Sequence, residues 1–410
     1  MELFKNTNYD FLGKKWPFII ASLILTGAGF ISMAVKGLNY GIDFKGGTQM
    51  TVKFASTPPL DKIREAFLHS AQAKGEVSVQ NITDPSTKDV VEIGIGTEQQ
   101  GEAQLNTNRT AMEQVLASTF GQPQSGKIDL NNTSQDKLAS RLSDALSRAS
   151  IAMSTDQVRT ITANIARYLS QHSGLMYSFN ELNGIPGVTP QIAGVIQQET
   201  YLAPYHISST AMVGPKVGAE LRQKAVLATL YALGGMLVYI AFRFEWIYGV
   251  GAVIAVFHDT LITIGLFSIF NEQISMTVIA ALLTLVGYSM NDTIVIFDRI
   301  RENLKLSRRD SLERVMNVAV NQTLSRTVMT SGLTFITAVA LFLFGGPVLH
   351  GFSFALVCGI LVGTYSSVFI ASPIVLFWHN YADKPKKTAP PALAATARTE
   401  TVRKPTKAVK

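Results

Sequence analysis

The sequence predicts an α-helical polytopic membrane protein with six transmembrane helices. An external α+β ferredoxin-like domain, carrying a helical insertion, is expected between the first two helices. Two observations predict this fold class. The 410 residues are 47% hydrophobic and only 16% charged, which is more apolar than one globular core of this length requires. The apolar excess is concentrated in long segments, whereas the residues after the first segment alternate as the strands and helices of a soluble domain do.

Six apolar segments are long enough, or nearly so, to cross a membrane. A bilayer's hydrocarbon core takes roughly 20 helical residues. The predicted spans are residues 17–35, 225–242, 246–270, 274–297, 328–344 and 350–378. The first span is expected to remain as an anchor, because no clear small-residue cleavage motif follows it.

Basic residues predict the orientation of these spans, because Lys and Arg in short flanking loops stay on the cytoplasmic side. Connections 271–273 and 345–349 contain no Lys or Arg, whereas the opposite side is basic. Residues 1–16 and 379–410 are therefore expected to be cytoplasmic, and residues 36–223 to be external. The basic residues that decide this are Lys5, Lys14, Lys15, Arg243, Arg299, Arg301, Lys305, Arg308, Arg309, Arg314, Lys384, Lys386 and Lys387.

The external region begins with a strand in which Met50, Val52 and Phe54 alternate with polar residues. Such alternation indicates a strand with one buried face. The patterns that follow predict a helix at 60–73, strands at 76–82 and 90–95, a helix at 107–120 and a strand at 205–213. The order β-α-β-β-α-β is typical of a ferredoxin-like core, here residues 41–120 and 203–213.

Residues 121–202 are a polar insertion whose apolar residues recur at helical spacing, so we expect a small subdomain of amphipathic helices. The string "ELNGIPGVTPQIAGVI" within it resembles a helix-hairpin-helix turn. Such turns often bind a nucleic-acid phosphate. Outside the cytoplasmic membrane, however, packing or protein contact is the favoured use, and no nucleic-acid partner is expected.

The tail at 379–410 is rich in Pro, Ala, Thr and Lys, and it has too few large apolar residues to fold. A solvated, disordered basic tail is expected. The net charge of +7 comes mostly from this tail and the loops, and it indicates attraction to anionic membrane lipid.

Ionisable residues inside the apolar spans are the candidate functional site. His258 and Asp259 lie near the middle of the third span, Asp292 lies in the fourth, and Arg326 precedes the fifth. Short connections make neighbouring spans antiparallel, so His258, Asp259 and Asp292 are predicted to share one interhelical seam. A charge at such depth is costly and is usually retained for moving ions or substrates.

Two structural alternatives stand beside the functional one. Asp292 and Arg326 could form a static ion pair that fixes the helix register, and His258 could simply hydrogen-bond between helices. The sequence contains no phosphate-binding glycine loop, nucleophile elbow or HExxH signature. We therefore expect no enzyme activity, no cofactor and no metal, with the energy supplied by an ion gradient or by a partner.

Seven short motifs are spread over all six spans and the core of the external domain. They are "GIDFKGGT", "VGPKVGAEL", "FRFEW", "HD" at His258–Asp259, "GYSMNDTIVIFDRIREN", "NQTLSRTVMTSG" and "FGGPVLHGFSFALVCGILVGTYSS". Together they resemble the SecF family, the smaller subunit of the bacterial SecD/SecF protein-export accessory complex, whereas residues 121–202 lie outside the usual family pattern.

The resemblance implies membership of the resistance-nodulation-division superfamily, a place in the bacterial inner membrane and a periplasmic external domain. It implies pairing with SecD to assist preproteins through the SecYEG channel with the proton motive force, alongside SecA and with YajC as a further candidate partner. In the family, the aspartate of the "ND" pair and the arginine of "SRT" are the functional charges. Here they are Asp292, preceded by Asn291, and Arg326.

The mechanism we expect is a population shift, in which protonation of Asp292 weakens its attraction to Arg326 and the helices repack. One alternative is a proton-coupled exporter of small molecules or lipids from the same superfamily, which would need a substrate pocket in or above the bundle. Another is a purely structural subunit that stabilises SecD. Copurification with SecD and the translocase would favour the export accessory, whereas copurification with an outer-membrane exit duct would favour the small-molecule exporter. Retained export after substitution of Asp292 and Arg326 would favour the purely structural subunit.

Overall fold

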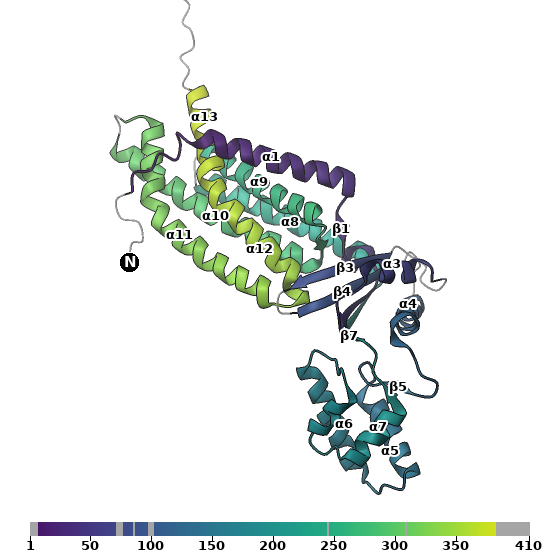
Figure 1. The fold of residues 1–410 in the computed structure, drawn as a ribbon. Coiled ribbons are helices and arrows are strands. Elements are labelled where there is room, and N and C mark those ends of the chain that lie inside the picture. Colours follow the sequence, from purple (N-terminus) through teal and green to yellow (C-terminus); the bar gives the residue numbers. More distant parts are fainter. Residues whose placement is uncertain are drawn as a thin grey trace, which may run out of the picture.

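The computed structural model describes residues 7–70, 77–84, 87–96, 102–243, 246–307 and 310–382. Within them, six helices are long and apolar enough to cross a membrane, and they lie side by side in one bundle (Figure 1). This confirms the polytopic fold class. The helices are α1 (Lys15–Lys36), α8 (Pro215–Arg243), α9 (Trp246–Phe270), α10 (Met276–Leu306), α11 (Leu312–Phe344), and the sixth span formed by α12 (Pro347–Ser366), η3 (Ser367–Ala371) and α13 (Ser372–Ala382).

Three helices extend well beyond the predicted spans. Helix α8 begins at Pro215 rather than 225, α10 continues to Leu306 rather than ending at 297, and α11 begins at Leu312 rather than 328. The predicted bounds stopped where charged residues appear. The extensions of α10 and α11, however, bury Ile300 and Met316 in the same core as the spans. The extension of α8 packs Gly218 against the backbone of Phe44 and Gly46.

The C-terminal boundary also differs from the prediction. Helix α13 continues to Ala382, so residues 379–382 are helical and do not belong to a disordered tail. The rest of the predicted tail lies outside the described residues, as do residues 1–6 of the predicted N-terminal segment.

Small residues let the membrane helices approach closely. A Cβ atom added to Gly29 of α1 would lie 2.9 Å from the Cα atom of Gly265 in α9. Gly363 in α12 lies against Ser289 of α10, where an added Cβ would be 3.0 Å from the serine Cβ. Contacts of this kind bring polar groups on neighbouring helices within hydrogen-bond reach.

The external domain has the ferredoxin-like β-α-β-β-α-β order. Its four strands pair antiparallel in the order β3-β4-β2-β7. The predicted ferredoxin-like core is therefore confirmed. Its elements are β2 (Gly47–Phe54), α3 (Leu60–Leu68), β3 (Val77–Asp84), β4 (Thr87–Gly96), α4 (Glu102–Leu116) with the π-helical turn η1 (Ala117–Gly121), and β7 (Tyr205–Val213).

The two faces of this sheet differ. Met50, Val52 and Ile93 point toward α3 and α4 and are fully buried with Phe67 and Met112. The alternate residues of the same strands are mostly polar, and they face the external ends of the membrane helices. The sheet therefore rests its polar face on the membrane domain (Figure 1).

A short parallel pair ties the external domain to the bundle. After α1, the chain forms β1 (Asn39–Tyr40), which pairs with β8 (Gln273–Ile274) in the connection between α9 and α10. The one-turn helix α2 (Ile42–Lys45) follows, and its Asp43 Oδ2 accepts a hydrogen bond of 2.8 Å from the backbone N–H of Met276.

The insertion is a compact helical unit with its own apolar core, in which Leu142, Ile165 and Ile196 are buried. The chain leaves and re-enters through a parallel pair of strands, β5 (Ile128–Asp129) and β6 (Thr200–Tyr201). Between them are α5 (Gln135–Arg148), α6 (Thr155–Gln171), the 3₁₀ helix η2 (Phe179–Gly184) and α7 (Pro190–Glu199).

The predicted helix-hairpin-helix turn packs inside the insertion. Gly187 adopts a φ of +88°, which an L side chain rarely adopts, and an added Cβ would lie 3.3 Å from Ile161 of α6. The turn therefore serves packing, as the sequence favoured.

Two asparagines join the insertion to the sheet. Asn131 Nδ2 donates to the carbonyl of Ala203 at 2.8 Å, and Asn132 Nδ2 donates to the carbonyl of Tyr205 at 3.0 Å. The backbone N–H of Ile207 in β7 donates to Asn132 Oδ1 at 2.8 Å. The insertion is thus fixed to the sheet's edge strand.

Candidate functional site: buried carboxylates between the membrane helices

Asp292 lies inside the bundle on α10 and is 3% exposed. Its Oδ2 accepts one hydrogen bond, of 2.8 Å, from the hydroxyl of Ser331 on α11. The described residues provide no other hydrogen bond to this carboxylate and no ion pair within 4.0 Å. An ionised carboxylate with so few partners in an apolar bundle is costly.

Arg326 lies within α11, five residues before Ser331, and not at the entrance of the span. It is exposed on the surface of this chain and makes no contact ion pair with Asp292 among the described residues. The static ion pair that was the structural alternative is therefore not formed among the described residues, and the coupling between Asp292 and Arg326 stays a prediction.

Asn291 precedes Asp292 and points to the opposite side of α10, where it is exposed. It makes no hydrogen bond among the described residues. The "ND" pair therefore presents one side chain to the bundle interior and one to the surface.

Asp259 lies in the middle of α9, is 1% exposed and has several partners. His258 Nδ1 donates to Asp259 Oδ1 at 2.9 Å. The hydroxyls of Ser289 on α10 and Ser366 on α12 donate to Asp259 Oδ2 at 2.5 and 2.8 Å. This carboxylate is therefore held by three helices, as a buried charge requires.

The network around Asp259 reaches the first span. His258 Nε2 forms a short hydrogen bond with the hydroxyl of Ser22 on α1, and this hydroxyl lies 3.0 Å from the hydroxyl of Tyr365 on α12. Four helices therefore converge on the His258–Asp259 pair. We call this set of residues the Asp259 network: Ser22, His258, Asp259, Ser289, Tyr365 and Ser366.

The predicted seam of His258, Asp259 and Asp292 is divided in the structure. His258 and Asp259 are in contact, whereas Asp292 reaches α11. The two regions meet on α10, where Ser289 and Asp292 are three residues apart, or about one helical turn. Thr293 beside Asp292 lies 2.9 Å from the hydroxyl of Ser367, where the sixth span has its π-helical turn.

The sequence reasoning missed the hydroxyl residues that hold the two acids. Ser22, Ser289, Ser331 and Ser366 are each at most 4% exposed. These residues could have been sought in the sequence as serines within apolar spans. Such a serine would lie one or two helical turns from an acid, or on a neighbouring span that faces the acid. Such serines are common in membrane helices, so sequence alone does not select these four.

Within the residues that the structure describes, no group of three or more His, Cys, Asp or Glu side chains could hold a metal ion. The site is therefore a set of carboxylates, an imidazole and hydroxyls between helices. Together with the six spans and the ferredoxin-like domain, it defines a polytopic membrane protein with acids buried between its spans.

Comparison with known proteins agrees with this class. Residues 195–381 match the family "Protein export membrane protein SecD/SecF, C-terminal", and residues 31–58 match the "SecD/SecF GG Motif" family. The protein translocase subunit SecF of Koribacter versatilis is 44% identical over 388 residues, which cover 93% of this chain and 94% of the relative. That of Calditerrivibrio nitroreducens is 36% identical, covering 92% and 96%. The chain belongs to the SecF family.

A solved structure has the same fold. The crystal structure of SecDF, a translocon-associated membrane protein from Thermus thermophilus, matches 92% of this chain with a TM-score of 0.63 and 29% identity. A super-membrane-facing form of SecDF matches with a TM-score of 0.52. This chain covers only 39% of the length of the first of these structures.

Proposed function

We propose that this chain works with a SecD subunit in the bacterial inner membrane and uses the proton motive force to help preproteins cross through the SecYEG channel. SecA and YajC are the further partners that this function implies, and membrane lipid surrounds the spans. Relatives named protein translocase subunit SecF support the proposal, as does the similarity to SecDF, a translocon-associated protein. In this function the chain is a proton-coupled transport accessory and not an enzyme.

The proposed orientation has both termini in the cytoplasm and residues 36–223 in the periplasm. The basic loops support it. The start of α1 and the end of α13 also lie at the end of the bundle opposite the sheet (Figure 1). Within the external region, the proposed division is an α+β core of 41–120 and 203–213 and an insertion of 121–202.

The observation that carries the proposal is the burial of Asp292 with a single hydrogen-bond partner. Proton binding removes its charge, which removes both the desolvation cost and the attraction to Arg326. Because a single hydrogen bond, from Ser331, joins the Asp292 carboxylate to α11, the change in its charge is proposed to shift α11 relative to α10. Proton flow down the gradient then alternates two packings of the bundle and moves the external domain.

The other predicted proton-coupling residues have different roles in this proposal. The Asp259 network is the fixed frame against which α10 and α11 move, with His258 linking α9 to α1. Asn291 is exposed beside Asp292, and its side chain is proposed to contact a neighbouring subunit or lipid. A charge crossing the membrane potential is worth about 2.3 kcal/mol per 100 mV, so a few protons provide enough free energy for a domain movement.

The test is the Asp292→Asn substitution in the complete complex. We expect the variant to lose the proton-dependent stimulation of preprotein export in inverted membrane vesicles or proteoliposomes. The variant chain should still insert into the membrane and copurify with SecD. Asp298→Asn is the matched control, because Asp298 is on the same helix but is exposed and pairs only at the surface with Arg243 at 3.2 Å. Normal proton-driven export by the Asp292→Asn variant would show that Asp292 does not couple proton flow to export.

A further inference from the structure

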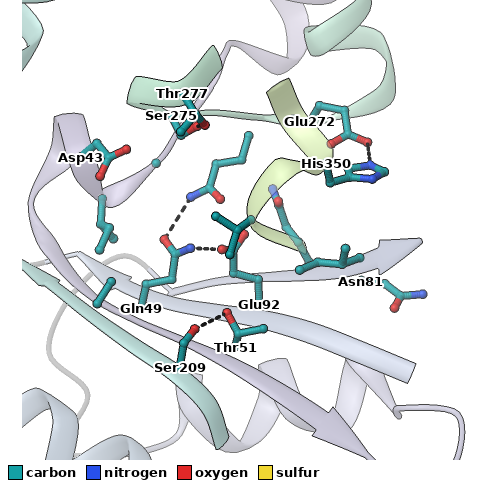
Figure 2. A pocket seen from close by; sticks show the side chains of 18 residues that line it. Asp43, Gln49, Thr51, Asn81, Glu92, Ser209, Glu272, Ser275, Thr277 and His350 are labelled. Atoms are coloured by element: carbon teal, nitrogen blue, oxygen red, sulfur yellow. Dashed lines mark hydrogen bonds and ion pairs between the residues drawn. The ribbon is translucent and has the colours of Figure 1, made fainter. Parts of the chain in front are cut away.

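A polar cavity of about 250 Å³ lies where the sheet meets the membrane domain (Figure 2). Four titratable side chains from different elements line it. They are Asp43 of α2, Glu92 of β4, Glu272 between α9 and β8, and His350 of α12. The buried carboxylates of the membrane helices are not part of it, so it is a separate site.

Glu92 lies on the polar face of the sheet, between core residues Val91 and Ile93 that point the other way. Gln49 Nε2 on the neighbouring strand donates a short hydrogen bond to Glu92 Oε1. Gln49 Oε1 in turn accepts a hydrogen bond of 3.3 Å from Gln273 Nε2 of the membrane domain (Figure 2). Glu92 is therefore joined to the membrane domain through one glutamine.

The charges facing Glu92 are unbalanced. Asp43 and Glu272 are acidic, and His350 is the one basic group that lines the cavity. His350 Nε2 lies 3.4 Å from Glu272 Oε1, and its Nδ1 is buried without a hydrogen-bond partner among the described residues. The facing strands β2, β3 and β7 contribute only uncharged side chains, namely Gln49, Thr51, Gln80, Asn81, Ile82, Ser209 and Ala211.

Burial between the two domains raises the pKa of Glu92 from 4.5 to about 7. The carboxylates of Asp43 and Glu272 add to this rise, and His350 opposes it. The group therefore exchanges its proton near neutral pH while the domains are in contact.

We propose that Glu92 is a second, external proton-binding site, and that its protonation holds the external domain against the membrane domain. With Glu92 neutral, the cavity contains two ionisable acids and one histidine. With Glu92 ionised, three acids face one another across the contact and favour separation. The biological role of this site rests on the proposed function, in which the external domain moves. The pH outside the membrane would then control whether that domain is docked.

The direction of the pH effect follows from linkage. If the domains separate, Glu92 meets water and its pKa returns toward 4.5, so the docked form binds the proton more tightly. Docking is then fully favoured below about pH 4.5, weakens as the pH rises toward 7, and is constant above that. Exchange of one proton changes the docking equilibrium by up to roughly tenfold per pH unit within this window.

The test measures the distance between the two domains in the full chain in lipid nanodiscs from pH 4.5 to 8. Spin labels at L68C on α3 and F344C at the external end of α11 span the contact, and both positions are well exposed. C358S removes the native thiol. In the parent, pulsed electron resonance should find a docked population that falls as the pH rises from 4.5 to 7. A parent distance that does not change with pH would overturn the inference.

Three variants separate the possible causes. Glu92→Gln keeps a partner for Gln49 but cannot ionise, so it should stay docked at every pH. Glu113→Gln, an exposed carboxylate on α4 that pairs with Arg109, should behave as the parent. His350→Gln removes the group that lowers the pKa of Glu92, so the transition should move to higher pH. An unchanged pH response in Glu92→Gln would also overturn the inference.

The Asp292→Asn variant distinguishes this inference from the proposed function. It should retain the pH-dependent distance change while proton-driven export is lost. Normal export by Asp292→Asn would count against the proposed function alone. Loss of the distance change in Asp292→Asn would show that the membrane site controls docking, and it would overturn the role given to Glu92.

Discussion

The two buried aspartates of the membrane domain have opposite surroundings. Asp259 accepts hydrogen bonds from His258, Ser289 and Ser366, whereas Asp292 accepts one, from Ser331. Both are almost completely buried. Depth in a membrane bundle therefore does not by itself identify a proton carrier. A carboxylate with all its partners in place is stabilised as a charge, whereas one with a single partner has little to lose when it becomes neutral.

The largest expected effect separates these two acids by stability. Asp259→Ala leaves His258, Ser289 and Ser366 without their acceptor, so it should lower the free energy of unfolding by about 3 kcal/mol or more. Asp292→Ala removes one interhelical hydrogen bond and should cost about 1 kcal/mol. Denaturant unfolding in detergent micelles measures both. Equal losses would end the distinction between the two sites.

A smaller effect tests whether α1 belongs to the Asp259 network through packing. Gly29 and Gly265 touch, so Gly29→Val should push α1 from α9 and cost about 1–3 kcal/mol by overpacking. The same change should weaken the contact between Ser22 and His258. Gly27→Val is the control on the same helix, because an added Cβ there meets nothing within 4 Å.

Proton-driven export gives this variant a second readout. Since α1 does not contact Asp292, export per folded molecule should fall less in Gly29→Val than in Asp292→Asn. An equal loss of export in the two variants would mean that α1 takes part in proton coupling and is not only part of the fixed Asp259 network.

The smallest effect concerns a single hydroxyl. Ser22→Ala removes the hydrogen bond to His258 and should cost about 0.6 kcal/mol, the average for interhelical hydrogen bonds in membranes, and at most about 1.7 kcal/mol. Ser32→Ala also removes a bond between α1 and α9, to Ser268 at 2.9 Å, but lies outside the network. Thermal unfolding followed by fluorescence compares the two. A larger cost at Ser32 would mean that the Asp259 network adds nothing beyond ordinary helix contacts.

Much of this fold could be predicted from local patterns. Runs of apolar residues predicted the six spans, and alternation at Met50, Val52 and Phe54 predicted the first core strand of the sheet. The helix ends were placed less well. Charged residues near 298 and 314 read as loops, although one face of each helix there continues into the core. Amphipathic extension of a span is decided by tertiary burial, which a hydropathy pattern does not contain.

The site was predicted in its residues but not in its pairing. The cost of an intramembrane charge drew attention to Asp292, Asp259 and His258. Which group each acid would contact depended on helix rotation. Ser331 and Arg326 are five residues apart on α11, so the rotation and the axial position of this helix decide which of them reaches Asp292. Both are set by packing between helices far apart in the chain, which a local sequence pattern does not contain.

The fastening of the helical insertion has a mechanical consequence. Asn131 and Asn132 clamp it to the end and edge of β7, and strands β5 and β6 close its base. A force on the far end of the insertion would therefore act directly on β7. Strand β7 ends at Val213, and α8 begins two residues later at Pro215. Because the insertion extends from the sheet on the side away from the bundle (Figure 1), any tilt of the sheet would move the far end of the insertion further than the sheet itself.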